Sequence, residues 1–381
     1  PNLDTDIVVE GDGLAFAGRL AELFSAQLRC HRRFGTAVLA FSCGMKVDVA
    51  TARKEAYARP GALPAVSYGD IAADLARRDF SINAMAVVIN GDSFGRVVDY
   101  FNGIKDIARR RIKVLHSLSF VDDPTRMLRA ARFEQRYGFR LERKTSVLFK
   151  QARQENMLSC VSRQRIREEL ILCLKEPCAL KIILRIGRLY GWGFVSDGIE
   201  LAGNNRIFLK DLARAVDEFP RCYRNRRRLD RWIILFIGLL DGLSLRRVLT
   251  VCRKFAFRRG DECRILSYFR DSRHIAERLK AKILPPSGVY RLLNPLSFEA
   301  IVLIMVKYKK YAIIRKRIDE FLARHNRLRL NVSGADLKRI GLCPGPHFKK
   351  MLLKTLYAKI DSRVKDKQGE IEFIRKIMLQ K

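Results

Sequence analysis

The first predicted strand of the chain lies in the stretch NLDTDIVVE, residues 2–10. Because residues i and i+2 of a strand point to the same face, Asp4 and Asp6 are expected to converge on one side of it. Two carboxylates this close repel each other unless a cation lies between them, and Mg²⁺ fits such a site when substrate phosphates add further ligands. The alternative is an ordinary strand end at the surface, and the stretch alone does not decide between the two.

A second predicted strand, residues 46–51, carries Asp48 inside an apolar run. A buried carboxylate requires a partner or a metal, so Asp48 is a third candidate ligand if this strand lies beside the first. The alternative is an Asp at a strand end that pairs with a nearby arginine. Between the two strands, residues 11–28 have helical periodicity, and residues 29–41 predict two short strands that turn at Phe34-Gly35.

Residues 70–88 (DIAADLARRDFSINAMAVV) have a helix-like pattern that contains the cluster Arg77-Arg78-Asp79. Arginine makes planar, bidentate contacts with phosphate groups. Asn83 follows Asp79 by four residues and therefore shares its face of a helix. Arg78, Asp79 and Asn83 are candidate nucleotide-binding residues, with a solvated charged face as the alternative. The preceding residues 51–64 predict a basic loop that covers phosphates or is an ordinary surface loop.

Residues 119–139 (SFVDDPTRMLRAARFEQRYGF) predict a long helical region whose first turn begins at Pro124. Three arginines recur at every third residue on one side, opposite an apolar face. Asp123 offers acceptors and Arg126 offers donors, and such a pair is able to recognise the hydrogen-bonding edge of a base. Arg129 and Arg132 are then candidates to hold a triphosphate. The alternative is a solubilising face.

The chain has 381 residues and a strongly basic balance, with 75 Lys+Arg against 40 Asp+Glu and a formal net charge of +35. Such an excess favours a polyanionic partner, most often nucleic acid, and an anionic membrane surface is the rival. No stretch approaches the ~18–20 apolar residues of a membrane span, and residues 232–240 predict a buried core helix. Nine scattered cysteines without a C-x-x-C pair predict free thiols in a reducing cytosol.

From residue 140 onward the pattern is almost entirely helical, with basic runs at residues 224–228, 307–310 and 315–317. Such runs favour sequence-independent contacts with a phosphate backbone, although any single run is also compatible with a solvated face. Near the end, residues 332–350 (VSGADLKRIGLCPGPHFKK) predict a short helix capped by Ser333, then a turn into another helix. The candidate RNA-binding residues of this half are Arg226, Arg227, Arg228, Lys349 and Lys350.

In their order along the chain, these segments resemble the class II tRNA nucleotidyltransferase and bacterial poly(A) polymerase superfamily. LDTDIVVEGD is similar to the D-x-D metal motif of that family. DLARRDFSINAMA is similar to its R-R-D-F-T-I-N-A-M-A block, with Ser81 in place of Thr. VDDPTRMLRAARF is similar to its E-D-x-x-R nucleotide template, with Asp122 in place of Glu. KVDVATARKE, VVDYFNGIKDI and ADLKRIGLCPGPHFKK also resemble family segments, so the resemblance covers essentially the whole chain.

The resemblance implies an α+β protein with a small, polymerase β-like nucleotidyltransferase head built on a mixed sheet, followed by an all-α neck, body and tail. It implies a head at residues 1–115, a base-recognising neck at 116–175, a body at 176–283 and a tRNA-binding tail at 284–381. The family's preceding strand and its Gly-Gly-x-x-R-D turn have no match here. We therefore expect a head that is incomplete at its N-terminus, either truncated or a defective copy, and inactive as it stands.

The resemblance also implies a template-independent tRNA nucleotidyltransferase that adds AMP, with CMP as a further option, to the tRNA 3′ end and releases pyrophosphate. The implied reaction uses two Mg²⁺ ions, and Asp48 would bind the ion on the side of the attacking 3′-hydroxyl. An A-adding enzyme is the first hypothesis; a CCA-adding enzyme or poly(A) polymerase is the alternative, and a non-catalytic basic RNA-binding protein is the second alternative. The expected partners are ATP, optionally CTP, and the acceptor and T arms of tRNA. The expected location is the cytoplasm, and no membrane partner is expected. The implied metal ligands are Asp4 and Asp6, and the implied nucleotide ligands include Arg78, Asp123, Arg126, Arg129 and Arg132.

Overall fold

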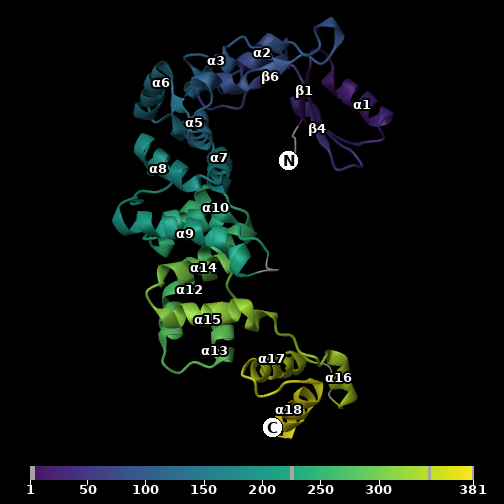
Figure 1. Ribbon diagram of the computed structural model, residues 1–381, viewed down its shortest axis with the longest axis vertical. Helices are drawn as coiled ribbons and strands as arrows, with labels where there is room; N and C mark the ends of the chain where they lie inside the picture. The colour runs from purple at the N-terminus through teal and green to yellow at the C-terminus, as the bar shows by residue number, and fades with distance from the viewer. Residues whose placement is uncertain (1–4, 224–226, 342–344, 380–381) are drawn as a thin grey trace. The chain divides into compact units, whose positions relative to one another are not determined.

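The computed structural model describes residues 5–223, 227–341 and 345–379 and divides the chain into two compact units, Pro1–Phe194 and Val195–Lys381. The first unit combines strands with helices, and the described part of the second is helical (Figure 1). This confirms the predicted α+β class. The four-part division into head, neck, body and tail stays a prediction, and the boundary after residue 194 falls inside the segment predicted as body.

The strands are β1 (Thr5–Val9), β2 (Gln27–His31), β3 (Thr36–Ala40), β4 (Lys46–Thr51), β5 (Arg53–Ala56), β6 (Ala65–Tyr68), β7 (Ala86–Val87), β8 (Val97–Val98), β9 (Arg111–Ile112) and β10 (Arg140–Leu141). The helices of the first unit are α1 (Gly13–Leu23), α2 (Ile71–Ala76), α3 (Gly103–Ala108), α4 (Ser119–Asp122), α5 (Arg126–Tyr137), α6 (Arg143–Gln154), α7 (Arg163–Lys175) and α8 (Ala179–Leu189). Short 3₁₀ turns span Arg32–Phe34, Ser81–Asn83, Gly91–Ser93 and Met157–Cys160.

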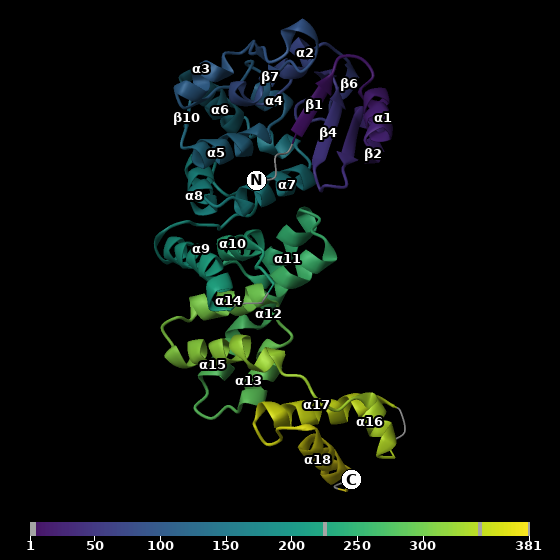
Figure 2. The same ribbon diagram turned by 45° about the vertical axis from the view of Figure 1, so that its right-hand side comes forward.

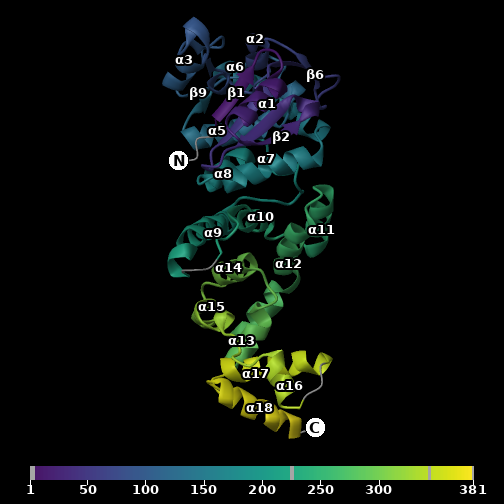
Figure 3. The same ribbon diagram turned by 90° about the vertical axis from the view of Figure 1, so that its right-hand side faces the viewer.

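The helices of the second unit are α9 (Gly203–Cys222), α10 (Arg231–Leu240), α11 (Leu245–Lys254), α12 (Arg259–Lys280), α13 (Pro286–Leu293), α14 (Phe298–Lys307), α15 (Ala312–Ala323), α16 (Gly334–Arg339), α17 (Pro346–Ile360) and α18 (Lys367–Leu379), with a 3₁₀ turn at His325–Arg327. The predicted core helix is confirmed, because every residue from 232 to 240 in α10 is buried. The predicted cap at Ser333 is also confirmed, since Ser333 and Asp336 form a capping box at the start of α16. Helices α16, α17 and α18 lie together towards the C-terminus (Figure 3).

A mixed four-stranded sheet in the order β1-β4-β3-β2 begins the first unit. Strand β1 runs parallel to β4, whereas β3 is antiparallel to both β4 and β2. Helix α1 covers one face, where Ala17 packs against Leu39 and Val49 (Figure 2). Because side chains alternate along a strand, Asp6 and Asp48 lie on the opposite face.

The helix and the strand pair predicted for residues 11–41 are confirmed. Asp12 caps α1, and its Oδ1 accepts hydrogen bonds from the backbone N–H groups of Leu14 and Ala15. Strands β2 and β3 form the predicted hairpin, and Gly35 closes its turn with a φ of +60°, a left-handed conformation that glycine adopts without strain. The segment predicted as a basic loop is partly a second hairpin, β5 with β6, so that part of the prediction was wrong.

Residues 70–88 do not form one helix. Helix α2 ends at Ala76, and the chain continues as an extended segment and a 3₁₀ turn. The reason is tertiary packing: Phe80 is fully buried and packs edge-on against Phe133, while Oδ1 of Asp79 bonds the N–H of Phe80 and the side-chain amide of Asn83. The predicted proximity of Asp79 and Asn83 is present, but a turn rather than a helix produces it.

The helical region at residues 119–139 is also interrupted. Helices α4 and α5 are separated by residues 123–125, where Oδ1 of Asp123 accepts hydrogen bonds from the N–H and the hydroxyl of Thr125. Pro124 has no N–H to donate, so it favours this break. The break turns the Asp123 carboxylate away from a regular helical position and towards the pocket described below.

Across the described ranges, no single helix is long and apolar enough to span a membrane. One pair, α13 with α14, passes the same test of length and composition when the two helices are taken together, although they are bent by 114° at the break between them.

Candidate active site

Asp6 and Asp48 are register partners on the parallel strands β1 and β4, which places their carboxylates side by side on the face opposite α1. Both residues are exposed, so the expectation that Asp48 is buried was wrong. Neither carboxylate forms an ion pair or a side-chain hydrogen bond with another described residue. Two exposed carboxylates held next to each other supply the oxygen ligands that a hard divalent cation prefers, so the pair fits a Mg²⁺ ion.

The third predicted carboxylate, Asp4, lies outside the described residues. Among the residues that are described, no group of three or more His, Cys, Asp or Glu side chains is arranged to hold a metal ion. The two carboxylates would therefore depend on further oxygen ligands, such as substrate phosphates, to complete a coordination shell.

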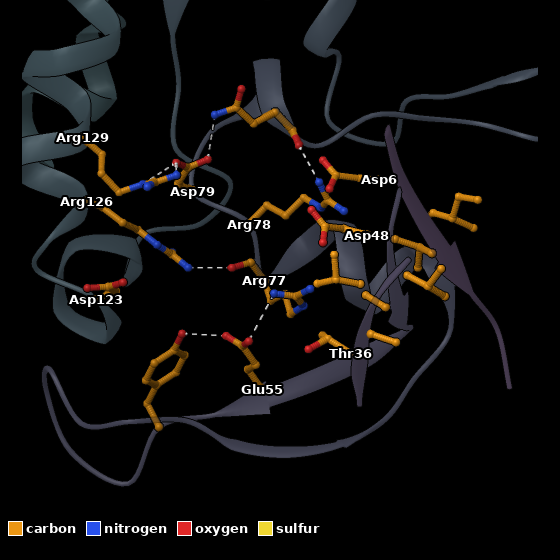
Figure 4. Close-up of a pocket in the computed structure, with 18 residues that line it drawn as sticks. Asp6, Thr36, Asp48, Glu55, Arg77, Arg78, Asp79, Asp123, Arg126 and Arg129 are labelled. Carbon is orange, nitrogen blue, oxygen red and sulfur yellow. Dashed lines mark hydrogen bonds and ion pairs between the residues drawn. The ribbon is translucent and has the colours of Figure 1, made fainter. Parts of the chain in front are cut away.

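A pocket of about 760 Å³ extends from these carboxylates to α5 (Figure 4). It brings together most of the predicted site residues from β1, β4, the segment after α2 and the start of α5. The predicted residues that line it are Asp6, Asp48, Arg78, Asp79, Asn83, Asp123, Arg126 and Arg129.

Asp79 and Arg129 form a close ion pair in this pocket. Nε and a terminal nitrogen of Arg129 contact Oδ2 of Asp79 at 2.7 and 2.6 Å, and the other terminal nitrogen contacts Glu169 on α7 at 2.9 Å. Burial alone would lower the pKa of Arg129, but the two carboxylates outweigh it and raise that pKa. Arg129 therefore stays charged, and it links the segment after α2 to α5 and α7.

The predicted base-recognition pair lies at the junction of α4 and α5. Arg126 is 4% exposed; its guanidinium donates to Oγ of Ser119 at 2.7 Å and to the carbonyl of Arg77 at 2.6 Å. Asp123 is held by Thr125 and by an ion pair with Arg165 of α7 at 2.9 Å. Both side chains line the pocket, and each is fixed in direction by neighbours outside the pair.

Arg78 and Asn83 also line the pocket. A terminal nitrogen of Arg78 contacts the buried Asp74 at 3.2 Å, and another donates to the carbonyl of Asn83 at 3.3 Å. These contacts hold the guanidinium at the pocket while leaving 31% of the side chain exposed. The position suits contact with a phosphate group.

Arg132 is not brought into the pocket. It is 7% exposed, contacts Glu169 at 3.4 Å and Glu176 at 3.6 Å, and lies over the ring of Phe133. The three-residue spacing placed Arg132 beside Arg129 correctly, but α7 covers that end of the helix. The carboxylates that pair with Arg129 and Arg132 come from the segment after α2 and from α7 and its C-terminal end, which the spacing within α5 did not reveal.

Several lining residues were not among the predicted ones. Glu55 and Tyr57 come from β5 and the residue just after it, and Arg77 precedes the predicted Arg78. Oε1 of Glu55 accepts from Arg77 at 3.2 Å, and Oε2 accepts from the hydroxyl of Tyr57 at 2.8 Å. The alternation of Arg53, Glu55 and Tyr57 in a segment taken for a loop is the sequence signal that could have indicated this strand.

The predicted RNA-binding residues belong to the second unit. Arg226 lies outside the described residues, and Arg227 forms a bidentate pair with the fully buried Glu299 at 2.8 and 2.7 Å. Arg228, Lys349 and Lys350 are exposed. Arg227 is thus committed to an internal ion pair, whereas the other three described cations face solvent.

Comparisons with known proteins agree with this arrangement. Residues 1–113 match the family model of the poly A polymerase head domain. The chain is 33% identical over 375 residues to an A-adding tRNA nucleotidyltransferase of Geobacter sulfurreducens, covering 97% of this chain and 42% of the relative. It is 31% identical to an A-adding tRNA nucleotidyltransferase of Halalkalibacterium halodurans, covering 100% of this chain and 86% of that relative.

The solved structure of a CCA-adding enzyme in an apo form has a TM-score of 0.76 and 31% identity to this chain, covering 100% of this chain and 88% of that one. The structure of the Thermotoga maritima CCA-adding enzyme complexed with tRNA has a TM-score of 0.70 and 31% identity to this chain. The match covers 99% of this chain and 87% of that one. The chain spans less than half the length of the Geobacter relative and most of the Halalkalibacterium one. Because these similarities extend over essentially the whole chain, it belongs to the tRNA nucleotidyltransferase and poly(A) polymerase family.

Proposed function

We propose that this protein is a template-independent, A-adding tRNA nucleotidyltransferase that transfers AMP from ATP to the 3′ end of tRNA and releases pyrophosphate. One observation carries the proposal: a single pocket joins the Asp6–Asp48 carboxylates to the Asp123–Arg126 pair. The Asp6–Asp48 carboxylates are suited to phosphoryl transfer, and the Asp123–Arg126 pair is suited to base recognition. The A-adding relatives support this choice of nucleotide.

Asp6 and Asp48 would hold Mg²⁺, and Asp4 would be a further ligand. When bound, the metal would lower the pKa of the attacking 3′-hydroxyl and stabilise charge on the phosphate oxygens. The protein contributes mainly position and charge, as is usual in phosphoryl transfer. Arg78 would neutralise the triphosphate, while Asp79 and Asn83 would orient the rest of the nucleotide with Arg129.

The Asp123 carboxylate accepts hydrogen bonds only, and the Arg126 guanidinium donates them only. Together they match the exocyclic amino group and the adjacent ring nitrogen of adenine. Both side chains are already held by Arg165, Ser119 and the carbonyl of Arg77, so little order has to be imposed when ATP binds.

The second unit would hold the acceptor and T arms of tRNA through exposed cations. Contacts of this kind depend on phosphate charge and shape rather than on sequence. Arg228, Lys349 and Lys350 are suited to this role by their exposure, and Arg227 contributes by fixing the start of α10 through Glu299.

Incubation of the full-length protein with Mg²⁺ and labelled tRNA tests the proposal. One substrate ends in C-C and the other lacks all three terminal residues; ATP and CTP are offered separately and together. A single A on the C-C substrate, without incorporation of C, is expected. Incorporation of C on the shorter tRNA would replace the A-adding assignment with a CCA-adding one, and a long A-tail on unrelated RNA would indicate a poly(A) polymerase. No incorporation at all would leave a non-catalytic RNA-binding protein.

A further inference from the structure

The Asp123–Arg126 pair by itself does not separate adenine from cytosine. Both bases carry an exocyclic amino donor beside a ring-nitrogen acceptor, so a carboxylate and a guanidinium satisfy either of them. The next position differs, since cytosine presents the O2 carbonyl where adenine presents a C–H group. A residue elsewhere on the pocket wall must therefore contribute to the choice, and Tyr57 with Glu55 forms a part of that wall without an assigned role.

The hydroxyl of Tyr57 donates a hydrogen bond of 2.8 Å to Oε2 of Glu55. Oε1 of the same carboxylate accepts from Arg53 at 3.0 Å and from Arg77 at 3.2 Å. The Glu55 side chain is only 7% exposed and forms ion pairs with Arg53 and Arg77, and a carboxylate accepts hydrogen bonds without donating any. The proton between Tyr57 and Glu55 therefore belongs to the phenol, and the direction of that hydrogen bond is fixed.

Burial, the hydrogen bond to Glu55 and the charge of Glu55 all raise the pKa of Tyr57. The phenol consequently stays neutral at any working pH. The charges of Arg126 and Asp123 act on the same pKa in opposite directions, which agrees with the position of Tyr57 beside the base-recognition pair. With its proton directed at Glu55, the phenolic oxygen can offer only lone pairs to a ligand in the pocket.

Glu55 is also connected to Arg126 through Arg77. The Arg77 guanidinium is bonded to the fully buried Asp74 at 2.7 and 2.9 Å as well as to Glu55. Its backbone carbonyl accepts the 2.6 Å hydrogen bond from Arg126. One carboxylate thus positions two features of the pocket, the Tyr57 oxygen on one side and the Arg126 guanidinium on the other.

We propose that Tyr57, oriented by Glu55, determines the selectivity for ATP over CTP, a role that rests on the nucleotidyl transfer proposed above. The acceptor-only oxygen of Tyr57 repels the O2 carbonyl of cytosine and tolerates the C–H group of adenine. Glu55 is a positioning residue, because it acts through Tyr57 and through Arg77 rather than on the nucleotide itself.

Three variants test this inference. Tyr57→Phe removes only the hydroxyl, and Glu55→Gln keeps the shape but replaces an acceptor-only group with one that is also able to donate. Tyr68→Phe is the matched control, because Tyr68 lies on the same hairpin and is 77% exposed. For each variant, kcat and KM are measured with ATP and with CTP on tRNA ending in C-C, and circular dichroism melting checks the fold.

Tyr57→Phe is expected to lower the ATP to CTP ratio of kcat/KM by about tenfold, mainly through improved use of CTP. Glu55→Gln is expected to lower the same ratio and also to lower kcat with ATP, because Arg126 loses part of its support. Tyr68→Phe is expected to leave both values unchanged. A general loss of stability would reduce the activity with ATP and with CTP equally. The ATP to CTP ratio of kcat/KM therefore separates a selective role from a structural one.

If the wild type adds AMP while Tyr57→Phe and Glu55→Gln keep the wild-type ATP to CTP ratio of kcat/KM, the inference is wrong and the proposed function stands. If the wild type adds no nucleotide, the proposed function fails, and binding of ATP and CTP to the same proteins by titration calorimetry decides the inference. An unchanged ratio of the two dissociation constants in Tyr57→Phe would overturn it, and a ratio that shifts towards CTP would support it.

Discussion

Nε of Arg129 donates a hydrogen bond of 2.7 Å to Oδ2 of Asp79, although the two residues lie fifty positions apart in sequence. The bond joins the segment after α2 to helix α5, and Glu169 extends it to α7. Residues that line one pocket, Asp79 and Arg129, therefore also hold three parts of the first unit together. Changes at this pocket are expected to affect both folding and activity, and the two effects have to be measured separately.

Asp48→Asn is expected to lower kcat by about 100-fold or more, because it removes one of two adjacent carboxylates while keeping the size of the side chain. The remaining activity should require more Mg²⁺, since the site has lost a charged ligand. Single-turnover AMP addition measured across a Mg²⁺ series checks both statements. Asp92→Asn, at an exposed position of a 3₁₀ turn, is the control. Activity of Asp48→Asn close to that of Asp92→Asn would remove the carboxylate pair from the mechanism.

Arg129→Met is expected to lower the free energy of unfolding by about 2 kcal/mol, because Asp79 and Glu169 are left largely buried without their shared partner. Arg136→Met on the same helix removes a half-exposed arginine that contacts Glu176, and should cost under about 1 kcal/mol. Urea unfolding followed by circular dichroism measures both variants. Equal losses in the two would show that the Asp79–Arg129 bond contributes no more to stability than a surface ion pair.

Glu299 makes the second unit sensitive to acid. Burial would raise the pKa of this carboxyl, but the hydrogen bonds from Arg227 and from the N–H of Asp230 outweigh burial and lower the pKa to about 2. Because the folded value lies below the unfolded one, the stabilisation is complete above about pH 4.5 and is lost as the pH falls towards 2. The loss should amount to about 3 kcal/mol in the unfolding free energy.

Urea unfolding at a series of pH values between 2 and 7 measures this loss. Glu299→Gln should be less stable than the wild type at pH 7 and should have a flatter pH dependence below pH 4.5. Glu200→Gln, at an exposed position, should keep the wild-type curve. A Glu299→Gln curve parallel to that of the wild type would assign the acid sensitivity to other carboxyl groups.

The double variant Lys349→Ala, Lys350→Ala is expected to weaken tRNA binding and to reduce the slope of log K against log salt by about 1 to 2. Lys309→Ala removes one positive charge, from a side chain whose ammonium is already paired with Asp211 at 2.6 Å, and should change the slope by less than half as much. Filter binding at several KCl concentrations provides the measurement. An unchanged slope in the double variant would show that Lys349 and Lys350 make no phosphate contact with tRNA.

Much of the site was predictable because its residues lie in short, regular patterns. Alternation along β1 predicted one face for Asp4 and Asp6, with Asp48 as a further candidate if its strand lay beside β1, and the structure puts Asp6 and Asp48 in register. The arrangement near Asp79 was harder to predict. Its four-residue spacing to Asn83 indicated a helix, but the buried Phe80 requires an extended segment at that point. Local periodicity carries no information about such a long-range contact, so the predicted helix was too long.

The sequence by itself determined the α+β class, the identity of the β1 and β4 carboxylates, helix α1, the capped helix α16 and the buried helix α10, because these depend on patterns within a few residues. Only the tertiary structure decided which charges neutralise one another. Glu169 and Arg165 of α7, and Glu55 of β5, pair with pocket residues that are distant from them in sequence. Their partners follow from the packing of helices and strands, and packing is a property of the whole first unit rather than of any stretch within it.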